Sequence, residues 1–129
     1  MSDATQVELI ALTQRLLDSI AAQDWATYEQ LCDRSITCFE PEARGHLVEG
    51  LPFHRFYFER KSESPARNNT ISSPHVRVIG DVAIVCYIRL IRSLDGQGRP
   101  ATTATEETRI WKRQAAGWRL VHLHRSTNS

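Results

Sequence analysis

A stripe of apolar residues at helical spacing marks the first part of the chain. Its members lie three or four residues apart, as on one face of an amphipathic helix: Leu9, Leu12, Leu16 and Ile20. Thr5 with Glu8, or alternatively Asp3 with Gln6, has the spacing of a capping box that starts a helix. The pattern predicts a long first helix whose wide apolar face packs against a sheet.

A short helix and a strand are predicted next. Asp24 is placed to cap a helix over residues 25–31, because aspartate accepts from the free N–H groups of a first turn. The β-prone run 36–39 predicts a strand. The segment 40–42, which contains a proline between two glutamates, ends this strand and predicts a solvated or capping turn.

The aromatic segment 51–61 predicts a third helix that begins near Pro52. Phe53, Phe56 and Tyr57 have the i, i+3, i+4 spacing of a single helix face, so we expect them to be buried. The polar, proline-containing segment 62–69 predicts a loop.

The second half of the chain has the pattern of a β-meander. Short apolar or threonine-rich runs alternate with turn sequences such as Gly80-Asp81 and Asp95-Gly96. The predicted strands cover residues 76–79, 82–92, 102–113 and 118–125. The run 82–92 is apolar on both faces, which predicts a central strand covered on both sides.

This order of elements predicts the α+β class, with residues 1–129 forming a single domain. A long N-terminal helix lying across a curved antiparallel sheet would enclose a cone-shaped pocket. The size of the chain leaves no room for a second domain.

The composition and charge of the chain argue against several classes of function. The chain has 16 Lys and Arg against 15 Asp and Glu, a net charge of +1 that gives no sign of nucleic-acid or membrane binding. It contains no apolar run long enough to cross a bilayer, no secretion signal and no phosphate-binding glycine loop. Three cysteines without scaffold spacing, Cys32, Cys38 and Cys86, favour reduced thiols and a cytoplasmic protein.

Three arginines, one on each of three consecutive predicted strands, are the main candidates for a binding site. Strand alternation places each one among apolar or aromatic residues: Arg89 with Val85, Tyr87 and Ile91, Arg109 with Glu107 and Trp111, and Arg125 with Val121 and Leu123. Converging guanidiniums would form a receptor for a carboxylate or a phosphate. The alternative is a set of structural ion pairs with Glu106, Glu107 or Glu59.

The histidines offer weaker chemistry. His122 and His124 share a strand face, as a metal pair could, but the spacing fixes no third ligand, so we expect no metal and no cofactor. His54 lies on the aromatic helix, from which it could face the pocket as an acid, a base or a donor to an anion. Cys86 is interpreted as a buried small hydrophobic residue.

Nearly the whole chain, residues 8–126, resembles the association (hub) domain of calcium/calmodulin-dependent protein kinase II. The resemblance is carried by short strings in the same order: CFEPEA at 38–43, LVEG at 47–50, FHRFYFE at 53–59, YIRL at 87–90, EETR at 106–109 and VHLHRS at 121–126. It also includes the spacing of the three strand arginines.

This resemblance implies a cone-shaped nuclear transport factor 2-like (cystatin-like) fold. It implies dimers that assemble into two stacked rings, a kinase as the associated partner, and calmodulin binding only as the context of the family. It also implies a pocket for small carboxylates or an acidic peptide, lined by Arg89, Arg109, Arg125 and His54; Tyr87 is a further candidate.

The sequence departs from the family in a shorter segment after Glu59, which lacks an aromatic residue, and in a tighter Gly80-Asp81 turn. The first helix begins almost at Met1, and the Met-Ser-Asp start favours a free-standing relative over an excised or engineered hub.

Three hypotheses follow. The leading one is a non-enzymatic oligomerisation module with an arginine-lined pocket. The second is a small isomerase-like or dehydratase-like enzyme of the same cone fold, which would act on an anionic substrate through His54 and Tyr87. The third is a carboxylate or phosphate sensor whose ligand shifts the oligomer equilibrium.

Overall fold

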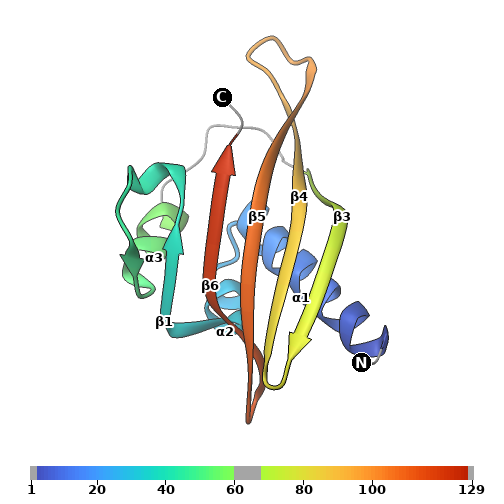
Figure 1. Cartoon of the computed structure of the whole chain (residues 1–129). Helices are drawn as coiled ribbons and strands as arrows, with labels where there is room; N and C mark the ends of the chain where they lie inside the picture. The colour runs from blue at the N-terminus through green and yellow to red at the C-terminus, as the bar shows by residue number, and fades with distance from the viewer. Residues whose placement is uncertain (1–2, 60–67, 128–129) are drawn as a thin grey trace.

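The computed structural model describes residues 3–59 and 68–127 (Figure 1). The chain contributes three α-helices, a short 3-10 helix and six strands within these ranges. The helices are α1 (Asp3–Ala21), α2 (Trp25–Leu31) and α3 (Pro52–Glu59), with the 3-10 helix η1 (Pro41–Ala43). The strands are β1 (Cys32–Phe39), β2 (Val48–Glu49), β3 (Asn68–Ile79), β4 (Val82–Leu94), β5 (Pro100–Gln114) and β6 (Gly117–Thr127).

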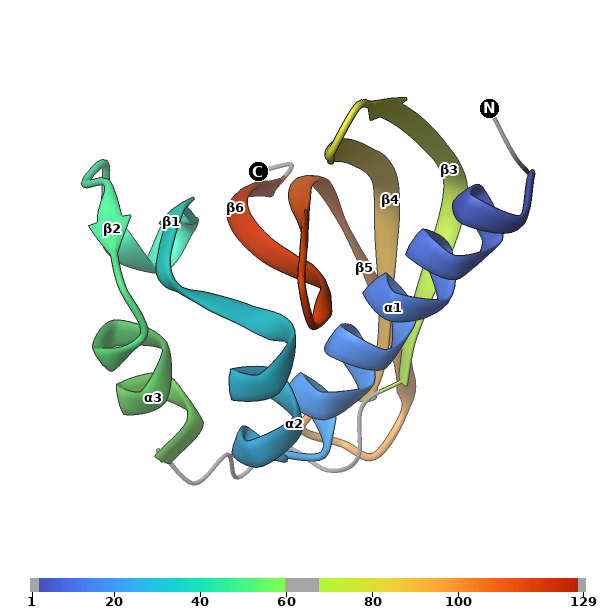
Figure 2. The same ribbon diagram turned by 90° about the horizontal axis from the view of Figure 1, so that it is seen from below.

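All six strands belong to one sheet, in the order β2-β1-β6-β5-β4-β3. The pairs from β3 to β6 are antiparallel, as is β1 with β2, whereas β1 and β6 run parallel. The sheet curves around α1, which crosses its concave face with α2 beside it (Figure 2). The α+β class and the long helix on a curved, mostly antiparallel sheet are therefore confirmed.

The core fills the space between α1, α2 and the concave face. Leu9 and Leu16 of α1 are fully buried, as the stripe predicts. The odd-numbered residues of β4 from Ala83 to Arg89 are also buried, since strand alternation points them all to this face. Trp111 of β5 is the largest fully buried side chain.

The start of α2 follows from its cap. The Asp24 carboxylate accepts hydrogen bonds from the Thr27 N–H at 3.2 Å and from the Thr27 hydroxyl at 2.6 Å. These contacts satisfy a backbone donor that a helix start leaves free. The predicted second helix and its capping residue are confirmed.

The predicted buried face of α3 is wrong at Phe56, whereas the side chain of Tyr57 lies outside the described residues. Phe56 is 59% exposed, whereas His54 is buried and Phe58 packs against the core. Phe53 is partly buried, as expected. His54 is buried because its ring contacts the Tyr28 hydroxyl at the core. Pro52 begins the helix as predicted.

All five predicted strands are longer than expected, and β3 differs most. β3 begins at Asn68 instead of residue 76, and a register shift between Ser72 and His75 interrupts its pairing with β4. The part of the predicted 62–69 loop at residues 68–69 is thus strand; the rest lies outside the described residues. β2 was not predicted at all.

The prediction that 82–92 is central and covered on both faces needs correction. β4 lies next to the edge strand β3. Its even-numbered residues, such as Ile84 and Ile88, point away from α1 and are half-buried within the described chain. Figure 1 looks onto this outer face, with α1 and α2 behind the sheet.

Candidate functional site

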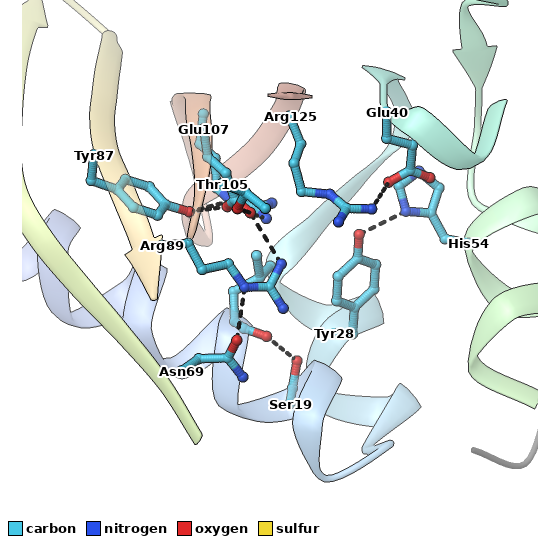
Figure 3. A network of polar contacts seen from close by, with 12 residues as sticks. Ser19, Tyr28, Glu40, His54, Asn69, Tyr87, Arg89, Thr105, Glu107 and Arg125 are labelled. Atoms are coloured by element: carbon cyan, nitrogen blue, oxygen red, sulfur yellow. Dashed lines mark hydrogen bonds and ion pairs between the residues drawn. The ribbon is translucent and has the colours of Figure 1, made fainter. Parts of the chain in front are cut away.

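The fold brings the three strand arginines together on the concave face. Arg89 of β4 and Arg109 of β5 are buried, and Arg109 is only 2% exposed. Arg125 of β6 lies on the same side, where its charge acts on Arg89 (Figure 3). The expectation that all three point inward is confirmed. We call Arg89, Arg109 and Arg125 the arginine cluster.

A bulge in β6 lies between Trp118 and Arg125 and interrupts the strand alternation that the prediction for Arg125 assumed. A register shift between β5 and β6 leaves Val121 without a paired residue. Leu120 and Leu123 on either side of it are both buried. This bulge interrupts the alternation from which Val121 was placed on the inward face with Arg125, and Val121 is half-buried.

Glu107 lies between two members of the cluster. Its Oε2 is 3.0 Å from Arg89 Nη1, and its Oε1 is 3.0 Å from Arg109 Nη2. Thr105 donates a further hydrogen bond to Oε2 at 3.3 Å. Burial alone would raise the pKa of Glu107, but the charges of Arg109 and Arg89 outweigh it and lower this pKa to about 2. The carboxylate is therefore ionised at neutral pH.

Tyr87 completes the contacts of this carboxylate. Its hydroxyl donates to Glu107 Oε1 at 2.5 Å and accepts from Arg109 Nε at 2.8 Å. Burial is the main cause that raises the pKa of Tyr87 well above its usual value. The phenol thus stays protonated and acts as a link between Glu107 and Arg109.

Arg89 is also fixed from the helix side. Its Nε donates to Asn69 Oδ1 at 2.7 Å, and Asn69 is itself buried. The carbonyl of Asn69 accepts from Gln14 of α1 at 2.9 Å. These bonds connect the guanidinium to β3 and α1, so its position is set by three elements.

His54 occupies the other side of the cluster. Its Nδ1 is 2.7 Å from the Tyr28 hydroxyl, and its Nε2 is 3.6 Å from Cys38 Sγ. Burial, together with the charge of Arg109, lowers the pKa of His54 to about 4. Burial also raises the pKa of Cys38 to about 12. Near neutrality both groups are therefore uncharged, and His54 does not contact Tyr87.

Glu40 is a site residue that the sequence reasoning missed. It precedes η1, but its side chain makes no capping hydrogen bond there. Instead its Oε2 lies 3.7 Å from Arg125 Nη2, and each of the two side chains is 16% exposed (Figure 3). The available signal was the CFEPEA string, but nothing in it indicates contact with a residue on the last strand.

Arg109 retains one unused donor. Its Nη1 is buried and has no hydrogen-bond partner among the described residues. A buried guanidinium N–H without an acceptor is costly, because desolvation is not compensated. Nη1 is therefore the nitrogen of this guanidinium that the described residues leave without an acceptor.

The convex face carries a different set of polar residues. His122 and His124 both belong to it, and His122 Nδ1 lies 2.7 Å from Thr37 Oγ1. An open groove of about 420 Å³ crosses this face, with Cys86, Thr108 and His124 among its lining residues. Cys86 is half-buried, so its interpretation as a buried residue is only partly right.

No group of three or more His, Cys, Asp or Glu within residues 3–59 and 68–127 is arranged to hold a metal ion. In the same ranges, no helix is long and apolar enough to cross a membrane.

The chain is similar to known proteins in both sequence and fold. The family model described as the calcium/calmodulin dependent protein kinase II association domain matches residues 5–129. The chain is 48% identical to the Chlamydomonas reinhardtii hub homology domain of this kinase, with a TM-score of 0.90 and coverage of 97% of this chain and 99% of that one. The Caenorhabditis elegans association domain is 45% identical, with a TM-score of 0.88 and coverage of 96% of both chains.

Among curated proteins, the calcium/calmodulin-dependent protein kinase type II of Caenorhabditis briggsae is 44% identical over 125 residues. The match covers 96% of this chain but 23% of that protein, so the chain spans about a quarter of the relative's length. A nuclear transport factor 2-like protein from Salmonella enterica shares the fold at 20% identity, with a TM-score of 0.80 and coverage of 100% of this chain and 94% of that one.

Proposed function

Because the chain belongs to the calcium/calmodulin-dependent protein kinase II association domain family, we propose that it is an assembly module. Copies pair into dimers, and the dimers build a ring-like homo-oligomer. The supporting observation is the convex face of the sheet. Ile84 and Ile110 form a cross-strand pair there and are only half-buried by the described chain. A second copy of the sheet would cover this apolar surface.

A charge placed in this face tests the assembly. We expect Ile110→Glu to lower the sedimentation coefficient to that of a smaller species, because a glutamate would be buried without a partner. Ala116→Glu, in the exposed turn between β5 and β6, adds the same charge elsewhere and should sediment like the parent. Equal sedimentation of both variants and the parent would contradict this choice of interface.

We propose as a second function that the arginine cluster binds a small carboxylate or the acidic side chain of a peptide. Support comes from the buried Arg109 Nη1, which lacks an acceptor in the described chain. Glu107 and Tyr87 accept hydrogen bonds from Nε and Nη2 of that guanidinium, and Arg125 lies on the same face, 3.7 Å from Glu40. An incoming carboxylate would satisfy Nη1 and gain a charge-assisted hydrogen bond.

Calorimetric titration with butyrate tests this second function. Arg109→Lys keeps the positive charge beside Glu107 but removes the planar fork of donors. We expect the variant to bind butyrate roughly tenfold or more weakly, the loss of one charged hydrogen bond. Arg113→Lys, an exposed position on the same strand, is the matched control. Equal binding by Arg109→Lys and the parent would contradict the role of this donor.

We infer that binding at the cluster is not followed by proton-transfer catalysis. General acid–base catalysis works best with a group whose pKa lies near the operating pH. The pKa of Glu107 is lowered to about 2 and that of His54 to about 4, while burial raises that of Tyr87. Each of these three groups is therefore held in one protonation state near neutrality.

A further inference from the structure

Three histidines lie on the convex face of the sheet, which is the face proposed above to meet a second copy. His75, Cys86, Thr108 and His124 are register partners in one row across β3, β4, β5 and β6. His122 lies two residues before His124 on β6, so its side chain points to the same face. The charge of an imidazole changes close to neutral pH. A surface that packs on this face therefore meets groups whose charge depends on pH.

His122 is held in place by two residues of β1. Its Nδ1 lies 2.7 Å from Thr37 Oγ1, and its ring meets the ring of Phe39 edge-on, with the centroids 6.2 Å apart. The side chain is half-buried within the described chain. Burial lowers the pKa of His122 below the 6.5 of a free histidine, and the charge of His124 adds to this effect. The ring is therefore neutral near neutrality and takes up a proton in mildly acidic solution.

Apolar side chains lie on both sides of His122. On the β1 side, Phe39 is 39% exposed and also contacts the ring of His124, with the centroids 5.6 Å apart. On the β5 side, the register partner of His122 is the half-buried Ile110. Figure 1 shows β6 between β1 and β5 on this face. A second copy that covers Phe39 and Ile110 must also cover the imidazole between them.

Burial of this imidazole favours its neutral form, because a charged group loses its hydration when it is covered. Among the charged residues of the face, the nearest acid by register is Glu49 of β2, and Thr37 separates it from His122. The charged residues that register places in the rows around His122 are Arg77, Lys112, Arg119, Glu49 and Glu106. A proton on His122 is thus added beside the basic residues of this set without a carboxylate as register partner.

We propose that the charge state of His122 controls the assembly of this chain: copies associate while the imidazole is neutral and separate when it is protonated. This inference rests on the proposed dimer and adds a regulation to it. A two-fold interface contains each of its residues twice, so protonation of His122 places two like charges in one interface. The association constant should therefore fall by up to about 100-fold for each pH unit below the pKa of the exposed histidine.

Dilution at two pH values tests this control. Light scattering coupled to gel filtration gives the concentration at which half of the protein has dissociated, at about pH 7.5 and about pH 5.5 and at constant ionic strength. The proteins are the parent, His122→Gln and His46→Gln. Glutamine keeps a donor and an acceptor for Thr37 but does not titrate. His46 is exposed and precedes β2, so its variant removes a histidine at another place. Far-UV circular dichroism checks that each protein stays folded.

We expect the parent and His46→Gln to dissociate at a much higher concentration at the lower pH than at the higher one, with an unchanged dichroism spectrum. The ratio of these two concentrations should be at least about tenfold smaller for His122→Gln, because its interface takes up fewer protons. His122→Asn is a second variant without a titrating ring, and it should give the same reduced ratio if His122→Gln does not fold.

The outcomes separate this control from the assembly itself. If the parent assembles equally well at both pH values, the control is refuted while the assembly stands. The same ratio in the parent and in the His122 variants would refute it as well, and so would a loss of the dichroism signal together with the loss of mass, because unfolding would then be the cause. A parent that is a single chain even at the higher pH would contradict the proposed assembly, and this inference would fail with it.

Discussion

Glu107 shares one carboxylate between two guanidiniums, so its loss would leave two buried charges uncompensated. Glu107 is one of three acids in the sequence that could neutralise the arginines, and the sequence alone does not show which of the three does so. Alternation places Glu107 inward and Glu106 outward, and the structure assigns the pairing to Glu107. Glu40 could not be found in this way, because its contact with Arg125 joins distant segments through folding alone.

We predict that Glu107→Gln destabilises the protein by about 3–5 kcal/mol, the usual cost of removing one partner of a buried ion pair. The measurement is urea unfolding at one fixed protein concentration, since assembly makes stability depend on concentration. Glu29→Gln, at an exposed position of α2 away from the convex face, should change stability by less than about 0.5 kcal/mol. Unfolding of both variants at the same urea concentration would show that Glu107 does not stabilise the protein through its ion pairs with Arg89 and Arg109.

His54 gives the stability of the protein a dependence on pH. Its pKa is about 4 in the folded chain, against 6.5 for an unperturbed histidine, so the unfolded chain binds its proton first as the pH falls. Stability from this residue is therefore full above pH 6.5 and is lost between pH 6.5 and 4. The loss amounts to about 3 kcal/mol at the acid end of this window.

The matching experiment compares the parent with His54→Gln across this pH range by urea unfolding. The variant should lack the loss of about 3 kcal/mol that is due to this histidine. His46→Gln, at an exposed position, should keep the pH profile of the parent. A His54→Gln profile that runs parallel to that of the parent would show that another group is responsible.

Among the elements, those with local signals were predicted best. The stripe in α1, the Asp24 cap of α2 and the proline at the start of α3 each act within a few residues. β3 was predicted too short because residues 68–75 are polar and contain a proline. They form a strand because β4 provides ladder partners on both sides of the bulge. The burial of His54 was not predicted because it depends on a tertiary contact, with Tyr28.

The bulge in β3 gives a test at this scale. Ser73 has a φ of 52°, in the left-handed region that a β-branched residue rarely enters. We predict that Ser73→Val destabilises the protein by about 1–2 kcal/mol. Ser72→Val, at the neighbouring paired position, should be tolerated because valine fits an extended strand. The midpoint of urea unfolding measures both, and equal midpoints would argue against strain at Ser73.

For the whole molecule, the two faces of the sheet have different proposed roles. The concave face holds the arginine cluster, of which the described chain buries Arg89 and Arg109. The convex face presents half-buried isoleucines and an open groove, which a second copy would cover. The fold could be predicted from the order of elements. The interface could not be predicted from the sequence. The apolar pattern of β4 indicates that both faces of this strand are covered, but it does not identify what covers the outer one.

Assembly into a homo-oligomer built from dimers, as proposed above, would set the mass of this protein in solution. Light scattering coupled to gel filtration measures the molar mass of the purified chain at micromolar concentration. We expect a single species whose mass is an even multiple of the 14.7 kDa chain. A species of 14.7 kDa, unchanged as concentration rises, would contradict it.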